Sequence, residues 1–174
     1  VLIANKLDIP ILYISSAGIF DGCKDAYDDW DVPDPLGIYA RSKYMGEQYV
    51  SGHARRYLIC RAGWMMGGGN KDKKFVKKIM TQINSGATEL SVVNDKDGTP
   101  TYTHDFAKNT MLLLESEMWG LYNMVCHGMT SRYEVAAEIL RILGLENKIK
   151  LNSVESDFFS EEYFAPRPQC ERLI

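Results

Sequence analysis

A tyrosine and a lysine four positions apart are the first residues whose types and spacing could do chemistry. Tyr39 and Lys43 lie in a segment that we expect to be helical, where positions i and i+4 share one face. A neighbouring ammonium group stabilises a phenolate and so makes a phenol usable as an acid or base near neutral pH. The pair is weak evidence by itself, because an ordinary exposed helix pair has the same spacing.

The elements before this pair give it weight. The apolar run 9–14 predicts a buried strand, and Ser16 follows it directly. Asp34-Pro35 is typical of a helix start, because an Asp can cap the first turn and a Pro is tolerated inside it. The helix that contains Tyr39 and Lys43 is therefore expected to run from there to about residue 51.

Three chemical features are expected to meet at one rim of the sheet. Ligands of doubly wound sheets bind beyond the carboxyl ends of the strands. Ser16 follows one such end, and Ala62-Gly63-Trp64 follows the strand expected at 57–60. A hydroxyl donor, a Tyr/Lys pair and an aromatic loop are what carbonyl–alcohol chemistry on a nicotinamide cofactor requires.

Strand-like and helix-like segments alternate along the rest of the chain, which indicates an α/β fold with a largely parallel sheet. Ser131 and Glu134 have the spacing of a capping box, and Gly144 is expected to end the helix that they begin. The glycine-rich run 63–70 is expected to be a loop. Further strands are expected at 90–93 and 120–125, and further helices at 73–84 and 103–116.

Composition excludes several classes of protein. The 174 residues include 20 Lys+Arg and 23 Asp+Glu, so there is no general attraction to nucleic acid, and average charge and glycine content exclude wholesale disorder. Apolar runs are far too short to span a membrane. The four cysteines and three histidines are scattered, which argues against a disulfide framework or a metal site and favours the reduced cytoplasm.

Several segments resemble, in family order, motifs of the extended short-chain dehydrogenases/reductases. The resemblance is greatest to the dTDP-4-dehydrorhamnose reductase branch and covers nearly the whole chain. The matching segments are 11–16 and 19–22 (YIST and VFDG in that branch), 35–47 (PLNVYGRSKLAGE), 61–64 (RTSW), 90–95 and 98–103 (LSVVND and GSPTYT), and 166–168 (RRP).

The resemblance implies the C-terminal part of a Rossmann-like doubly wound parallel sheet with a small substrate-binding region. The implied reaction is hydride transfer from NADPH or NADH to the C4 keto carbon of a nucleotide-linked 4-keto-6-deoxysugar. Ser16 corresponds to the residue that hydrogen-bonds the substrate carbonyl, and Tyr39 to the proton donor. Lys43 corresponds to the residue that stabilises the phenolate and holds the nicotinamide ribose.

Other residues are assigned to binding by the same resemblance. Ala62, Gly63 and Trp64 correspond to the loop beside the nicotinamide and the sugar, where an indole can stack on either; a packed loop aromatic is the other interpretation of Trp64. Arg167 matches the family's Arg-Pro segment near the substrate. Tyr39 and Lys43 also count among the expected cofactor contacts.

Two departures from the family pattern affect the expected substrate site. Ala17 and Gly18 stand where the branch usually has Asp and Tyr, so the sugar bound beside Ser16 and Gly18 could differ. The run 71–78 holds five lysines, among them Lys74. This run is either a solvated helix face or an electrostatic site for a nucleotide diphosphate.

The resemblance also divides the chain. Residues 1–62 correspond to the end of the dinucleotide-binding domain, and 63–174 to the remainder of the sheet with the substrate-binding region. A glycine fingerprint between a first strand and helix, which would receive the cofactor's pyrophosphate, is absent. We therefore expect a missing N-terminal half as a partner, with the chain inactive alone, and leave a homodimer open.

Two other functions remain open. An epimerase or dehydratase of the same superfamily uses the same Tyr/Lys pair but regenerates its cofactor in each cycle. A non-catalytic regulatory subunit on this fold is the alternative from another class; it is weakened by the presence of Ser16, Tyr39 and Lys43, and kept open by Ala17 and Gly18.

Overall fold

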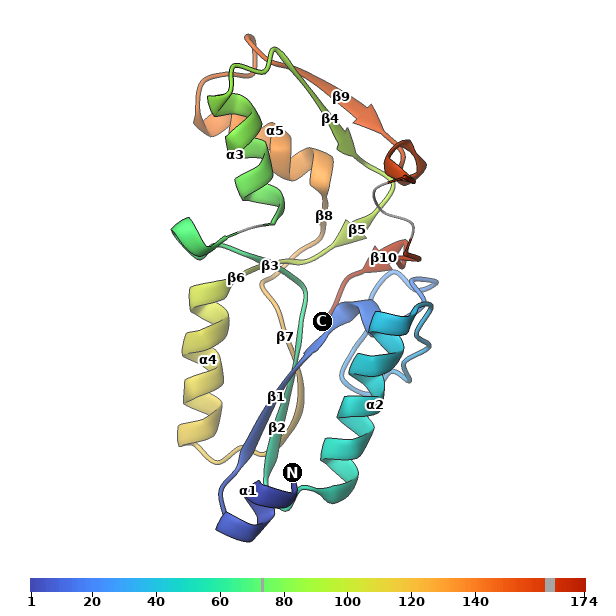
Figure 1. The fold of residues 1–174 in the computed structure, drawn as a ribbon, viewed down its shortest axis with the longest axis vertical. Helices are drawn as coiled ribbons and strands as arrows, with labels where there is room; N and C mark the ends of the chain where they lie inside the picture. Colours follow the sequence, from blue (N-terminus) through green and yellow to red (C-terminus); the bar gives the residue numbers. More distant parts are fainter. Residues whose placement is uncertain (73, 162–164) are drawn as a thin grey trace.

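A three-stranded parallel sheet forms the lower half of the molecule in the computed structural model, which describes residues 1–72, 74–161 and 165–174 (Figure 1). Its strands lie in the order β1-β2-β7, and the short helix α1 precedes β1. The helices α2 and α4 pack against β2 from opposite faces. The bounds are α1 Leu2–Leu7, β1 Ile11–Ser16, β2 Tyr57–Ala62, β7 Gly120–Met124, α2 Ile38–His53 and α4 Thr103–Glu115.

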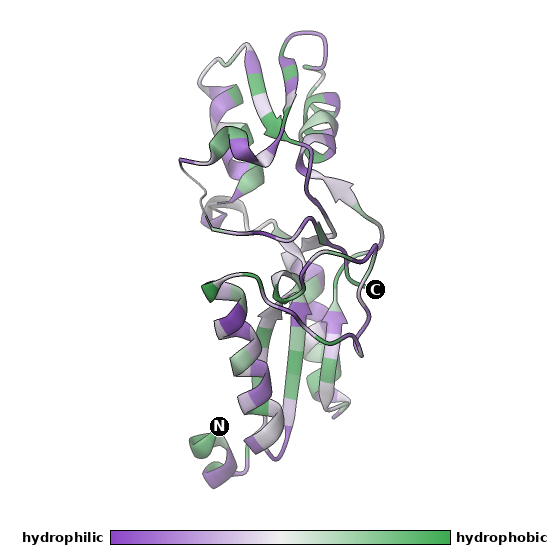
Figure 2. Cartoon of the chain, turned by 90° about the vertical axis from the view of Figure 1, so that its right-hand side faces the viewer, coloured by the Kyte–Doolittle hydropathy of each residue, from purple (hydrophilic) through white to green (hydrophobic). Residues whose placement is uncertain are grey.

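The middle strand β2 is the most deeply buried element of this sheet. Leu58, Ile59 and Cys60 have no solvent exposure, as expected for a strand covered on both faces. Leu58 and Cys60 pack towards Phe106 of α4. Burial raises the pKa of the Cys60 thiol to about 11, so this cysteine stays protonated in the core. Figure 2 shows the hydrophobic stretches along the strands of this sheet.

A second group of strands and helices forms the upper half of the molecule in Figure 1. Strands β4 and β9 pair in parallel, and α3 and α5 complete a separate core. The elements are α3 Phe75–Asn84, β4 Glu89–Val93, α5 Arg132–Ile142 and β9 Lys150–Val154. The buried residues of this core are Ile79, Leu90, Val92, Ala136, Leu140 and Ile149.

Short strands join the two halves. β3 pairs with β6, and β5 lies between β8 and β10. The bounds are β3 Trp64–Met66, β5 Asp97–Gly98, β6 Pro100–Tyr102, β8 Thr130–Ser131 and β10 Cys170–Glu171, with 3-10 turns η1 Ala17–Ile19, η2 Gly69–Lys71 and η3 Ser156–Phe159. Beyond β10, Leu173 bridges to Tyr27 and packs with the η1 turn.

The structure confirms the α/β class and the parallel sheet, and it corrects two local predictions. The glycine-rich run 63–70 is not wholly a loop, because its first part pairs with the distant strand β6. Helix α2 begins at Ile38 and not at Pro35, and Gly37 lies in extended conformation against Pro166. The capping box at Ser131 and Glu134 is confirmed.

A buried ion pair attaches α2 to the sheet. Arg61 of β2 donates from Nε to Glu47 Oε1 at 3.0 Å and from Nη2 to Oε2 at 2.9 Å, and both side chains are 3% exposed. The guanidinium also lies 5.2 Å from the ring centroid of Phe20. This two-point contact fixes geometry as well as charge.

We predict that Glu47→Ala lowers the free energy of unfolding by about 3–5 kcal/mol, because it leaves the Arg61 charge buried without its partner. The measurement is urea denaturation of the 174-residue chain. Glu138→Ala is the control, since Glu138 pairs with Arg141 at the exposed surface of α5 and should leave the midpoint unchanged. Equal midpoints for all three proteins would contradict the prediction.

Candidate active site

The end of β1 presents a hydroxyl that is free to donate. Ser16 Oγ accepts the backbone N–H of Gly18 at 3.2 Å, and this contact starts the η1 turn. The hydroxyl oxygen is positioned by accepting this hydrogen bond, and its O–H group remains available to donate one. A carbonyl oxygen placed at this rim could therefore accept a hydrogen bond from Ser16.

Tyr39 and Lys43 lie on adjacent turns of α2, as their spacing predicts. Tyr39 is in the first turn and is 53% exposed, so its phenol is accessible. Lys43 Nζ donates to the carbonyl of Ile14 at 3.0 Å, which places the ammonium against the last residues of β1. The other two ammonium N–H groups can reach further acceptors.

Tyr13 forms a platform under Lys43. Its ring centroid lies 5.3 Å from Lys43 Nζ, and its hydroxyl donates to the Lys43 carbonyl at 3.2 Å. Burial, with smaller contributions from Glu47 and Tyr39, raises the pKa of Tyr13, so this phenol stays a donor. The platform needs Gly46, because a Cβ there would lie 2.1 Å from the Tyr13 hydroxyl oxygen.

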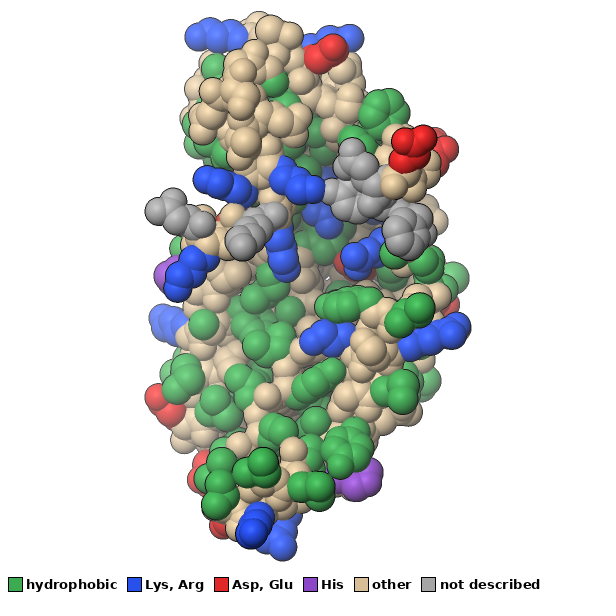
Figure 3. Space-filling model, viewed as in Figure 1, with side chains coloured by type: hydrophobic (Ala, Val, Ile, Leu, Met, Phe, Trp, Pro, Cys, Tyr) green, Lys and Arg blue, Asp and Glu red, His purple; other side chains and the backbone are tan. Residues whose placement is uncertain are grey.

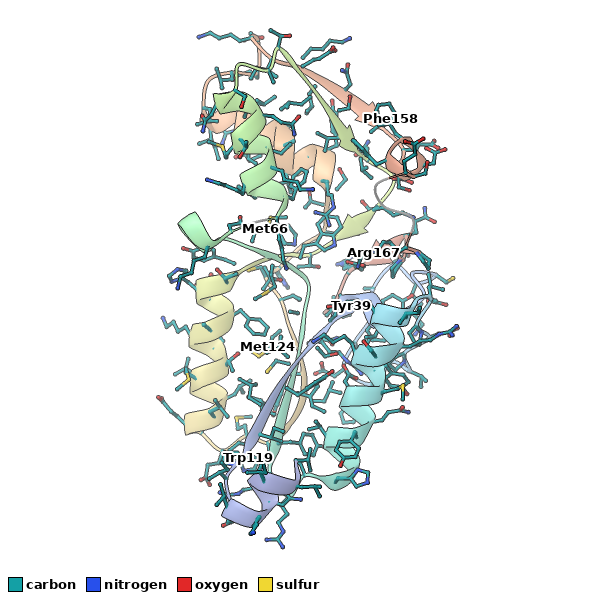
Figure 4. All side chains as sticks on the ribbon, viewed as in Figure 1. Tyr39, Met66, Trp119, Met124, Phe158 and Arg167 are labelled. Carbon is teal, nitrogen blue, oxygen red and sulfur yellow. The ribbon has the colours of Figure 1, made fainter. Side chains whose placement is uncertain are left out.

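A cavity of about 310 Å³ lies beside Tyr39. Gly18 and Tyr39 line it together with Arg167, whose guanidinium lies 5.9 Å from the Tyr39 ring centroid. Figure 4 shows Tyr39 at the N-terminal end of α2 with Arg167 above it. The structure therefore brings together Ser16, Gly18, Tyr39, Lys43 and Arg167.

Ala62, Gly63 and Trp64 extend this rim across the sheet. Ala62 is the register partner of Ser16, so the two strands end side by side. Trp64 is only 9% exposed: Gly98 lies against its indole, and the Arg132 guanidinium lies 4.4 Å from its ring centroid. These contacts give Trp64 a packing role, and stacking of its indole on a ligand stays a prediction.

Glu171 is a member of this cluster that the sequence did not reveal. Trp64 Nε1 donates to Glu171 Oε2 at 2.6 Å, and Glu171 Oε1 lies 3.3 Å from the position that a Cβ of Gly18 would occupy. A single glutamate between Cys170 and Arg172 has no local pattern that marks it. Only the return of β10 to the centre of the molecule, 107 positions after Trp64, places it here.

Lys74 is not brought into the cluster by any described contact. It is exposed at the start of α3, where its backbone N–H donates to Asp72 Oδ1 at 2.8 Å. Lys73, its neighbour in the lysine run, lies outside the described residues. Substrate binding by Lys74 therefore stays a prediction.

The cluster fits proton donation to a carbonyl oxygen. Ser16 offers a hydroxyl donor and Tyr39 an accessible phenol. The positive charge of Lys43 favours negative charge at the end of the sheet where this phenol lies. Lys43 also has N–H groups left for the hydroxyls of a ribose, so the donor set fits the nicotinamide end of a dinucleotide. Across the described ranges, no three His, Cys, Asp or Glu side chains are grouped as a metal site.

These features define a rim of hydrogen-bond donors on a Rossmann-like sheet, and the comparisons give the family of the chain. The family described as "RmlD substrate binding domain" matches residues 2–173, and the chain belongs to it. The spore coat polysaccharide biosynthesis protein SpsK of Bacillus subtilis is 32% identical over 166 residues, which are 95% of this chain and 56% of that protein.

Solved structures give the same answer. The dTDP-4-dehydrorhamnose reductase of Yersinia enterocolitica has a TM-score of 0.90 at 34% identity, over 98% of this chain and 59% of that one. The enzyme of Bacillus anthracis, solved in complex with NADP, has a TM-score of 0.90 at 29% identity and the same coverage. The chain thus spans less than two thirds of the length of these relatives.

Two glycines of α2 provide a matched test of the platform under Lys43. Gly46→Ala should lower the free energy of unfolding by about 1–3 kcal/mol, because its methyl would displace Tyr13. Gly52→Ala should raise it by a few tenths to about 1 kcal/mol, since nothing lies within 4 Å of its Cβ position and alanine favours the helix. Urea denaturation measures both, and a stabilising Gly46→Ala would contradict the packing described.

Proposed function

We propose that the protein carrying this chain is an NAD(P)H-dependent reductase of the C4 keto group of a nucleotide-linked 4-keto-6-deoxysugar. The observation that carries the proposal is the joint placement of Ser16, Tyr39 and Lys43 at the carboxyl end of β1 in a chain of this family. The NADP complex of the Bacillus anthracis enzyme supports the choice of cofactor.

Each residue of the rim has a role in this reaction. The Ser16 hydroxyl donates to the substrate carbonyl oxygen and orients the keto group. Tyr39 gives its phenolic proton to that oxygen as the C=O becomes an alkoxide, and Lys43 stabilises the phenolate that remains. The cofactor, when bound, supplies the hydride that reaches the C4 carbon and leaves as NAD(P)⁺. Substrate contacts of Gly18, Trp64, Lys74 and Arg167 belong to the same proposal.

Tyr39→Phe tests the proton donor. In the full-length protein it should lower kcat by at least about 100-fold, because the phenol is the acid of the reaction, while the fold is kept. The assay is NADPH oxidation at 340 nm with a dTDP-linked 4-keto-6-deoxysugar. Tyr49→Phe, on the exposed surface of α2, is the control and should retain activity. Unchanged turnover of Tyr39→Phe would remove Tyr39 from the mechanism.

The same assay separates the alternatives. A reductase consumes one NADPH for each sugar reduced, whereas an epimerase or dehydratase shows product without net NADPH loss. A regulatory subunit would give neither product nor NADPH loss. The stoichiometry of cofactor to product therefore decides between the three classes.

The free edge of β1 supports a nucleotide-binding half as the partner of this chain. β1 pairs only with β2 in the described sheet, so its other edge has unsatisfied backbone groups. Leu12 and Ile14 are 38% and 46% exposed on the face opposite to α2, where α4 packs on β2. Figure 3 shows hydrophobic side chains gathered over this half of the molecule.

We propose that a further parallel strand pairs with this edge and a helix covers Leu12 and Ile14, and that this half holds the phosphates of the cofactor. Residues 1–62 would then complete the dinucleotide-binding domain and 63–174 the substrate side.

The expectation of a cytoplasmic protein is kept with this proposal, since the four cysteines are free thiols. Within the described ranges, no helix is long and apolar enough to cross a membrane.

Calorimetric titration tests whether the other half of the protein binds the phosphates of the cofactor. The isolated 174-residue chain should show no micromolar binding of NADPH and no turnover, because under this proposal the helix N-terminus that receives the phosphates lies in the other half. The full-length protein should bind NADPH in the micromolar range or tighter. Tight NADPH binding by the isolated chain would show that the phosphate site lies within residues 1–174.

A further inference from the structure

The carboxylate of Glu171 has one oxygen engaged and one oxygen turned to the rim. The indole N–H of Trp64 donates to Oε2 at 2.6 Å. Oε1 lies 3.3 Å from the Cβ position of Gly18, and Ser16 Oγ lies 3.5 Å from that same position. The carboxylate and the Ser16 hydroxyl therefore both lie beside the same side of Gly18.

Gly18 is what makes this oxygen accessible. Its backbone lies outside the left-handed region, so a side chain would be conformationally allowed there. Any side chain would instead stand directly against Glu171 Oε1. The glycine thus leaves space beside Glu171 Oε1 at a residue that also lines the cavity with Tyr39 and Arg167.

Glu171 supplies a negative charge that the turn after Ser16 lacks. The segment after Ser16 has no carboxylate of its own before Asp21. Glu171 brings a carboxylate to the same turn from β10, at the other end of the chain. An ionised carboxylate only accepts hydrogen bonds, and no donor in the described part of the chain is bonded to Oε1.

We propose that Glu171 is a specificity-determining residue that accepts a hydrogen bond, through Oε1, from the hydroxyl on the sugar carbon next to the keto carbon. The inference rests on the proposed function, because Ser16 must hold the neighbouring carbonyl oxygen. The ligand class is a nucleotide sugar that keeps this hydroxyl. Trp64 fixes the carboxylate, so the acceptor is in place before the sugar binds.

Glu171→Gln separates this role from packing. The amide oxygen of Gln can still accept the Trp64 N–H, which leaves the uncharged NH₂ group facing Gly18. Tryptophan fluorescence in a background with Trp30 and Trp119 replaced by Phe should then match that of the same background with Glu171. Glu171→Ala, which removes the partner of Trp64, should shift the emission.

The binding test uses the full-length protein and two probes, a dTDP-linked 6-deoxyhexose and its 3-deoxy counterpart, titrated calorimetrically. The wild type should bind the 3-deoxy probe about 10- to 100-fold more weakly. Glu171→Gln should weaken binding of the hydroxylated probe by at least about 10-fold and should discriminate little between the two probes. Matched Kd ratios in both proteins, or no loss in Glu171→Gln, would overturn the proposal.

The readout does not depend on turnover. Absence of NADPH oxidation with normal discrimination between the probes would count against the proposed reaction but support the role of Glu171. Normal NADPH oxidation without discrimination by the wild type would support the reaction and overturn the role of Glu171. Failure of the wild type to bind either probe would overturn it as well.

Discussion

The buried ion pair between Arg61 and Glu47 determines how α2 is rotated on the sheet. Tyr39, Lys43 and Glu47 are spaced four residues apart and share one helix face. A helix held at Glu47 by two hydrogen bonds cannot turn about its axis without breaking both. The pair therefore directs the Lys43 ammonium to the Ile14 carbonyl and keeps Tyr39 at the same end of β1. Desolvation makes such a pair costly, so its main effect is on orientation.

Local sequence predicted the parts of this arrangement that depend on one element at a time. The spacing of Tyr39 and Lys43 gives a shared face wherever the helix begins. The apolar run before Ser16 predicts a buried strand, and the parallel sheet follows from the alternation of elements. Ser131 and Glu134 lie three positions apart, so their capping box is a purely local matter and was predicted correctly.

What the sequence could not show depends on contacts between distant segments. The strands of two or three residues, such as β5 and β10, are too short for any periodicity and exist because each finds a partner across the molecule. Gly37 lies against Pro166 and precedes the first residue of α2. This contact with a distant residue outweighs the local signal for a helix start at Asp34-Pro35. The proposed role of Glu171 was also invisible in the sequence, because it depends on contacts with the distant residues Trp64 and Gly18.

The path of the last described segment has a consequence for the order in which the molecule folds. Arg167, Glu171 and Leu173 are synthesised after every other member of the rim, yet they contact Tyr39, Trp64 and Tyr27. Such large sequence separations make loop closure entropically costly and folding slow. During translation the sheet and α2 can assemble first, with the turn after Ser16 still uncovered. The rim would then be completed only when the C-terminal segment emerges from the ribosome.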